Sequence, residues 1–227
     1  MKSFILMTTG RSGSTALMNT LAKYPDVAVP NKQIDCIDNE ILHPNFVNSY
    51  IPFYQQFSQV PISNEVEFIN CFYQSNKTST YAGFKSMPER HKQFQAIINS
   101  PHIQIITLIR RDISSTIASF IMAIDKKTWR RNGGKQSYSF TFSDQYKPRV
   151  LSHLKYIVNS RNKLKQFTNA ISLEYEDLCQ KDFENQNLNQ YFDREIKLSQ
   201  PKPPVNAKNH VKNWNDFQQF IQQHIPS

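Results

Sequence analysis

Glycine is scarce in this sequence, which has five among 227 residues. Two of the five, Gly10 and Gly13, lie within four positions of each other, shortly after the apolar run FILM. Glycine permits tight turns and a close approach of the backbone to another group. The pair therefore indicates a turn with a specific conformational requirement near the start of the chain.

Cysteine is also rare. Cys36, Cys71 and Cys179 lie far apart, and no two of them form the CxxC pair of a structural zinc site or the start of a disulfide framework. The six histidines show no HExxH spacing, so no metal is expected. Free thiols are typical of a reducing compartment, and we expect a cytoplasmic protein.

Long apolar runs are missing as well. No stretch of about 20 apolar residues is present, so no membrane-spanning helix is expected. The apolar run at the N-terminus is too short for a signal peptide. The length suits one folded unit, and we expect a single domain over residues 1–227.

Basic residues outnumber acidic ones, 27 to 18, which gives a formal net charge of +9. Such a charge suits a small anionic substrate, a nucleic acid, an anionic membrane surface or simply a solvated cationic surface. The basic residues occur only in short pairs such as Arg110-Arg111 and Arg130-Arg131. Without a basic tail or an arginine-rich run, nucleic acid is not an expected partner, whereas a peripheral membrane contact stays open.

Strand and helix patterns alternate from the first residues to about residue 180. Short apolar runs predict strands, and apolar residues at helical spacing predict helices between them. This alternation predicts an α/β fold with a central, mostly parallel sheet flanked by helices. The expected strands are 3–8, 27–30, 80–85, 102–109 and 170–175. The expected helices are 14–23, 64–74, 88–98, 110–124, 149–167 and 209–224. The expected loops are 128–148 and 200–208, and residues 31–62 are expected to be either a functional loop or a segment that contains short helices.

The turn over residues 10–15, GRSGST, joins the first expected strand to the first expected helix. Backbone N–H groups at the start of a helix have no helical partner, and the helix dipole favours negative charge there. Ser12, Ser14 and Thr15 add hydroxyl donors, and Arg11 adds a positive charge. The turn therefore predicts a binding site for a phosphate or a similar anion.

The same turn departs from the phosphate loop of the nucleotide triphosphatases. That loop needs a glycine five residues before its second glycine and a lysine directly after it. Thr8 and Ser14 occupy these two positions here. A small-molecule kinase is therefore the least favoured of the nucleotide-binding functions.

GRSGST after a first strand resembles the 5′-phosphosulfate loop of the sulfotransferases that use 3′-phosphoadenosine 5′-phosphosulfate (PAPS). These enzymes also have an arginine at the end of a central strand and a serine eight residues later, a spacing that Arg111 and Ser119 match. The resemblance implies the family's fold, similar to that of P-loop nucleotide kinases, and PAPS as co-substrate without a metal. It implies that the 3′-phosphate is bound by Arg111 and Ser119. The 5′-phosphosulfate would be bound by Arg11, Ser12, Gly13, Ser14 and Thr15.

Two weaker matches extend this resemblance to about residue 180. Gly83-Phe84-Lys85 is similar to a GFK-like strand, and Tyr175–Leu178 is similar to a YEDL segment of the bacterial and carbohydrate-directed members. The family's last donor-binding loop would fall within 200–214, where Lys202 and Lys208 match loosely.

Sulfuryl transfer needs positive charge at the leaving phosphate and a base for the acceptor's proton. Arg11 stands where some relatives have a loop lysine, which implies a role at the bridging oxygen. Glu40 fits the family's position for the base. His43 is the second candidate, because its ordinary pKa of about 6.5 suits proton transfer near neutrality. Lys85 is a further catalytic candidate, for the leaving group or the acceptor.

The resemblance implies an acceptor hydroxyl or amine on a glycan, a glycolipid or a small molecule. We expect this acceptor to bind between the segments 31–62 and 125–148. The alternative is a nucleotide-binding module without transfer activity, and it differs from the enzyme in whether Glu40 takes up a proton. Nothing in the sequence pattern sets an oligomeric state.

Overall fold

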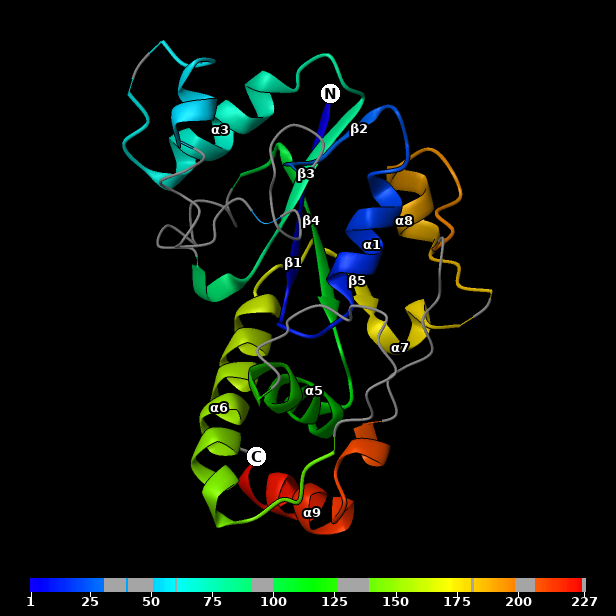
Figure 1. Ribbon diagram of the computed structural model, residues 1–227. Helices are drawn as coiled ribbons and strands as arrows, with labels where there is room; N and C mark the ends of the chain where they lie inside the picture. Colours follow the sequence, from blue (N-terminus) through cyan, green and yellow to red (C-terminus); the bar gives the residue numbers. More distant parts are fainter. Residues whose placement is uncertain are drawn as a thin grey trace.

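The computed structural model of the chain describes residues 1–30, 40, 51–59, 61–90, 100–125, 139–180, 182–198 and 207–225 (Figure 1). The strands in these ranges are β1 (Lys2–Thr8), β2 (Val27–Ala28), β3 (Tyr81–Ser86), β4 (Ile103–Ile109) and β5 (Ile171–Glu174). The α-helices are α1 (Ser14–Leu21), α3 (Glu65–Ser75), α5 (Ile113–Asp125), α6 (Lys147–Leu164), α7 (Tyr175–Leu178), α8 (Gln186–Tyr191) and α9 (Trp214–His224). Short 3-10 helices are η3 (Pro88–Arg90), η4 (Asp144–Tyr146) and η5 (Ala207–His210).

The described strands form one five-stranded sheet in the order β2-β3-β1-β4-β5, and each pairing between them is parallel. The predicted α/β fold, with a parallel sheet flanked by helices, is confirmed. After β1 the chain continues towards the β2 edge, and after β4 it continues towards β5 at the other edge. The strand order therefore reverses between β1 and β4. In sheets of this kind, ligands bind beyond the carboxyl ends of the strands at such a switch point.

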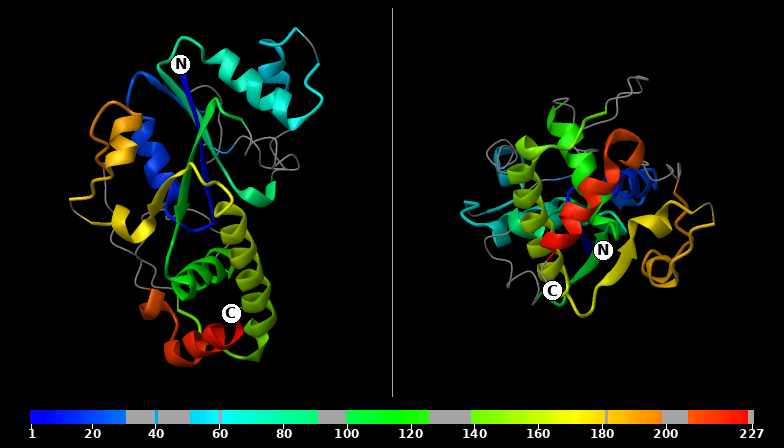
Figure 2. Two further views of the ribbon diagram at one scale, coloured as in Figure 1. Left: turned by 180° about the vertical axis from the view of Figure 1, so that it is seen from behind. Right: turned by 90° about the horizontal axis from the view of Figure 1, so that it is seen from below.

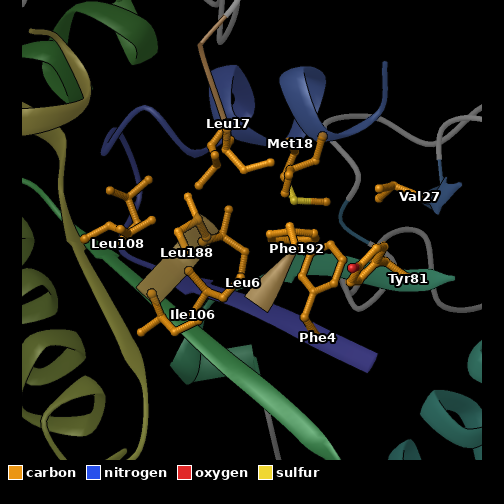
Figure 3. Close-up of a cluster of buried hydrophobic side chains, with 14 of the residues drawn as sticks. Phe4, Leu6, Leu17, Met18, Val27, Tyr81, Ile106, Leu108, Leu188 and Phe192 are labelled. Carbon is orange, nitrogen blue, oxygen red and sulfur yellow. The ribbon is translucent and has the colours of Figure 1, made fainter. Parts of the chain in front are cut away.

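Side chains of β1 alternate between the two faces of the sheet, as the two-residue period of a strand requires. Phe4 and Leu6 pack against α1 and α8 (Figure 3), whereas Ile5 and Met7 pack in a second cluster with α3. All four side chains are fully buried. Burial on both faces explains why this strand is a continuous apolar run in the sequence.

Gly83 of β3 lies directly beside Phe4 of β1 in the parallel register. A Cβ atom built on Gly83 would lie 2.5 Å from the Phe4 ring, which is closer than any real contact. The glycine of the GFK-like strand therefore makes room for an aromatic ring on the neighbouring strand.

Helices α5, α6 and α9 build a third apolar cluster, separate from the two that cover the sheet. Its centre contains Ile117 and Ile121 of α5, Leu154 of α6 and Phe217 of α9. Figures 1 and 2 show α5 and α9 beyond the carboxyl end of the sheet. This cluster supports the end of the sheet at which the switch point lies.

The observed elements follow the expected ones closely, with local shifts at their ends. The helix expected over 110–124 begins at Ile113, because Asp112 caps it and accepts a hydrogen bond from the Ser115 backbone N–H at 2.9 Å. Within the segment 31–62, residues 51–55 are helical, as one of the two expectations for this segment allows. Most of the other residues in the expected loops, and the expected helix beyond Arg90, lie outside the described residues. Among the described helices, none combines the length and apolar character needed to cross a membrane.

Candidate functional site

The turn between β1 and α1 has unusual backbone conformations. Arg11 and Gly13 both have positive φ angles, of 66° and 81°. Gly13 is the N-cap of α1, which has no side-chain cap and no acidic residue in its first turn. Left-handed residues within a turn direct successive N–H groups into a concavity that suits an anion, and an uncapped helix start adds further donors. The turn therefore has the backbone geometry and charge that an anion needs.

Gly13 is required for two independent reasons. Its φ of 81° lies in the region that favours glycine. In addition, a Cβ on Gly13 would lie 2.4 Å from Cδ2 of Tyr175, at the start of α7. The Tyr175 ring in turn has the buried guanidinium of Arg110 over it, 4.8 Å from the ring centroid. Burial raises the pKa of Tyr175 to about 12, so its phenol is neutral near physiological pH.

The hydroxyl groups of the turn differ in direction. Ser12 is fully buried, and its hydroxyl donates to the backbone oxygen of Thr9 at 2.8 Å and hydrogen-bonds with the Thr8 hydroxyl. Ser12 therefore closes the turn with its side chain and has only its backbone N–H to offer an anion. Ser14 and Thr15 begin α1, and neither hydroxyl has a hydrogen-bond partner among the residues described.

Arg11 and Ser119 connect the two parts of the sequence that resemble the sulfotransferase donor site. The Arg11 Nε atom donates a hydrogen bond of 3.1 Å to the Ser119 Oγ atom. Arg11 follows β1, and Ser119 lies in α5, the helix that follows β4. The contact therefore lies at the switch point between β1 and β4.

Arg111, the expected partner of Ser119, has its side chain directed elsewhere. Its Nε atom lies 2.9 Å from a carboxylate oxygen of Glu174, and its Nη2 atom lies 3.0 Å from one of Asp177. These carboxylates come from β5 and α7, and β5 pairs with β4 in the sheet. Within the described part of the chain, no hydrogen bond joins Arg111 to Ser119. The two residues stand at the same end of the sheet, but the structure joins Ser119 to Arg11 and Arg111 to carboxylates.

Two residues of α6 reach this site, and no sequence motif pointed to them. The Tyr156 hydroxyl donates a hydrogen bond of 3.2 Å to the Met87 Sδ atom, and burial raises the pKa of Tyr156 to about 12. The Arg161 guanidinium donates to the backbone oxygens of Arg110 and Arg111. Both are polar positions on an amphipathic helix, where the sequence alone favours exposure to solvent.

Of the catalytic candidates, Glu40 is buried and forms an ion pair with Arg90 of η3, with 3.0 Å between Oε1 and Nη1. Lys85 is also buried, at 4% exposure. The register places Lys85 beside Leu6, on the face of the sheet that α1 covers. His43 lies outside the described residues, as does Lys202, whereas Lys208 is an exposed residue of η5.

A scan of the known protein families finds none that matches this chain, and a search of the curated proteins finds no match. Among solved structures, the apo form of PAB0955, a GTPase from Pyrococcus abyssi, is similar over 98% of this chain and 97% of its own. The two chains share 15% sequence identity, with a TM-score of 0.29. A likeness at this TM-score supports no inference about function. The family of this chain therefore has to be argued from its own residues.

Proposed function

We propose that this chain is a PAPS-dependent sulfotransferase that acts on a hydroxyl or amine of a glycan, a glycolipid or a small molecule. The observation that carries the proposal is the 3.1 Å hydrogen bond from Arg11 to Ser119. It brings together the two motifs whose residues and spacing resemble the family's donor site. It does so at the switch point of a parallel sheet, where this class of fold binds nucleotides.

The turn after β1 supplies the groups that suit the 5′ end of the donor. The N–H groups of Gly13, Ser14 and Thr15 and the Arg11 guanidinium are donors for a phosphosulfate. The leaving oxygen gains negative charge during transfer, and fixed donors aimed at that oxygen stabilise the transition state. Ser119 and Arg111 are the donors proposed for the 3′-phosphate. To bind it, the Arg111 side chain gives up an ion pair with a carboxylate and forms one with the phosphate.

The proposed transfer is an in-line displacement at sulfur. The acceptor oxygen or nitrogen forms a bond to sulfur while the bond from sulfur to the bridging oxygen breaks. The electron pair of the broken bond stays on that oxygen, which leaves as part of the 5′-phosphate of adenosine 3′,5′-bisphosphate. The acceptor's proton passes to a base, for which we propose Glu40, with His43 as the second candidate.

The ion pair between Glu40 and Arg90 favours the alternative function, a nucleotide-binding module without transfer activity. A carboxylate oxygen that is engaged by a guanidinium is less available to take up the acceptor's proton. Glu40→Gln separates the two functions. In the enzyme, this change abolishes turnover and leaves affinity for adenosine 3′,5′-bisphosphate near that of the wild type. Turnover that survives the change means that Glu40 is not the base.

The binding test uses calorimetry of the whole chain with adenosine 3′,5′-bisphosphate, with adenosine 5′-monophosphate, and with ATP and Mg²⁺. We expect the bisphosphate to bind at least about ten-fold more tightly than the monophosphate, because its second phosphate adds charge-assisted hydrogen bonds. Tighter binding of ATP and Mg²⁺ than of the bisphosphate would support a kinase instead.

Ser119→Ala should weaken the bisphosphate by about five-fold and the monophosphate by less, because the change removes a donor to the 3′-phosphate as well as the contact that holds Arg11. Ser152→Ala, at an exposed position of α6, is the matched control and should affect neither ligand. Transfer of labelled sulfur from PAPS to a cell extract then tests catalysis directly. If the wild-type chain binds the bisphosphate but transfers no labelled sulfur, the alternative function, a nucleotide-binding module without transfer activity, is supported.

A further inference from the structure

We infer that Tyr175 and Glu176 are positioning residues for both anion-binding turns, Tyr175 for the turn after β1 and Glu176 for the turn after β4. This inference rests on the proposed function and extends it to residues that do not themselves contact the nucleotide. The two residues are neighbours in sequence, at the point where β5 passes into α7.

Glu176 holds the backbone of the turn after β4 with both oxygens of its carboxylate. Its Oε2 atom accepts the Arg111 backbone N–H at 3.0 Å, and its Oε1 atom accepts the Asp112 backbone N–H at 3.2 Å. A two-oxygen contact of this kind fixes orientation as well as distance. It therefore sets the direction in which Arg111 leaves the end of β4.

The carbonyl side of the same turn is held from another element. Arg161 of α6 donates through Nη2 to the backbone oxygens of Arg110 and Arg111, the latter at 3.1 Å. The N–H groups of Arg111 and Asp112 are thus bound by Glu176, and the carbonyl groups of Arg110 and Arg111 are bound by Arg161. Unlike the turn after β1, this turn offers a ligand its side chains rather than its amides. The position of the backbone then decides where the Arg111 guanidinium lies.

Tyr175 supports the other turn by packing. Its ring fills the space that a Cβ of Gly13 would need, with 2.4 Å to Cδ2. The Arg110 guanidinium lies against the same ring. The ring thereby holds the N-cap of α1, whose amides are the proposed donors for the 5′ end. One short segment therefore contacts both turns, which keeps the spacing between them constant.

The test measures nucleotide affinity by calorimetry for four variants of the whole chain, with adenosine 3′,5′-bisphosphate and adenosine 5′-monophosphate as probes. Glu176→Gln removes the charge and one of the two acceptors. We expect it to weaken the bisphosphate by about ten-fold and to leave the monophosphate within about two-fold. Glu184→Gln, at an exposed position just beyond α7, is the matched control and should change neither affinity.

Tyr175→Leu should weaken both nucleotides, because both have a 5′-phosphate at the turn after β1. Tyr175→Phe keeps the ring and should restore most of the lost affinity. Glu176→Gln is thus expected to affect only the bisphosphate, whereas Tyr175→Leu affects both nucleotides. A general loss of structure would not produce this difference. Should the Gln variant fail to fold, Glu176→Asp, which keeps the charge but shortens the reach, takes its place with the same expected selectivity.

Equal losses for both probes in Glu176→Gln, or no loss for either, would overturn the inference. So would a Tyr175→Leu variant with wild-type affinities. A wild-type chain that binds neither nucleotide counts against the proposed function itself. The two failures are therefore distinguished by the wild-type titration.

Discussion

Arg90 and Glu40 form an ion pair in which the Glu40 side chain is buried, at 7% exposure, and the Arg90 side chain is half-buried, at 21%. Arg90 lies in η3, just after the carboxyl end of β3, so the pair fixes Glu40 to the end of the sheet that bears the site. A carboxylate buried this deeply depends on its cation, because charge is costly to remove from water.

Removing the cation should therefore destabilise the protein strongly. Arg90→Ala leaves the Glu40 carboxylate buried without its guanidinium, and we expect a loss of about 3–5 kcal/mol in the free energy of unfolding, measured by urea denaturation. Arg149→Ala is the control, because its ion pair with Asp125 is more exposed and should contribute only about 0–1 kcal/mol. Similar losses in the two variants would show that Glu40 is not a buried charge that depends on Arg90.

The two glycines of the first turn should respond differently to alanine. Gly13→Ala forces a side chain into a left-handed conformation and against Tyr175, so we expect a loss of about 2 kcal/mol or more. At Gly10, the nearest atom to an added Cβ is Met87 Cε at 3.9 Å, an ordinary contact. Gly10→Ala should change stability by less than about 1 kcal/mol. Chemical denaturation measures both, and equal effects would contradict this account of the turn.

Alanine substitutions of Ser12 and Ser14 should have different effects, the first on the stability of the fold and the second on nucleotide affinity. Ser12→Ala removes a buried hydroxyl that serves Thr8 and Thr9, and we expect a loss of about 1–3 kcal/mol in unfolding free energy. Ser14→Ala should leave stability near that of the wild type and weaken adenosine 3′,5′-bisphosphate. Thermal unfolding and calorimetry measure the two quantities. A stable Ser12→Ala variant with reduced affinity would instead mean that the Ser12 hydroxyl contacts the nucleotide.

His153 of α6 should make stability depend on pH. Burial lowers its pKa from 6.5 to about 4 in the folded state. Between these values the unfolded chain binds a proton that the folded chain does not, so stability falls as pH falls through this window. The contribution lost between pH 7.5 and 5 is at most about 2 kcal/mol, because solvent reaches part of the half-buried ring.

The comparison of wild type with His153→Gln isolates this effect, because all other groups titrate in both proteins. Urea denaturation at several pH values should show the steeper fall for the wild type. Parallel curves for the two proteins would mean that His153 is protonated as easily in the folded chain as in the unfolded one.

The elements and the first turn could be predicted because their signals are local. The run FILM, the glycine pair and the helical spacing after Ser14 each depend on neighbouring residues only. The pairing of Ser119 with Arg11, and of Arg111 with Glu174, depends on which strands become neighbours in the sheet. The order of the strands brings together residues that are about 60 to 110 positions apart in the sequence. The periodicity of apolar residues does not predict this order.

Tyr156 and Arg161 escaped prediction for a different reason. A polar residue on an amphipathic helix looks the same in sequence whether it meets water or a backbone carbonyl. Only the placement of α6 beside the two turns makes Arg161 a donor to Arg110 and Arg111. The role expected of His43 stays a prediction, because this residue lies outside the described part of the chain.

The parallel sheet has a consequence for how the chain forms the proposed nucleotide site. β1 pairs with β3 and β4. Since parallel neighbours cannot be joined by a hairpin, these pairings form only after long crossovers have closed. The turn after β1 is thus synthesised before β3, β4 and β5, but it gains its final surroundings only once the residues around Tyr175 have docked. Nucleotide binding should accordingly report the completed sheet and appear late during refolding.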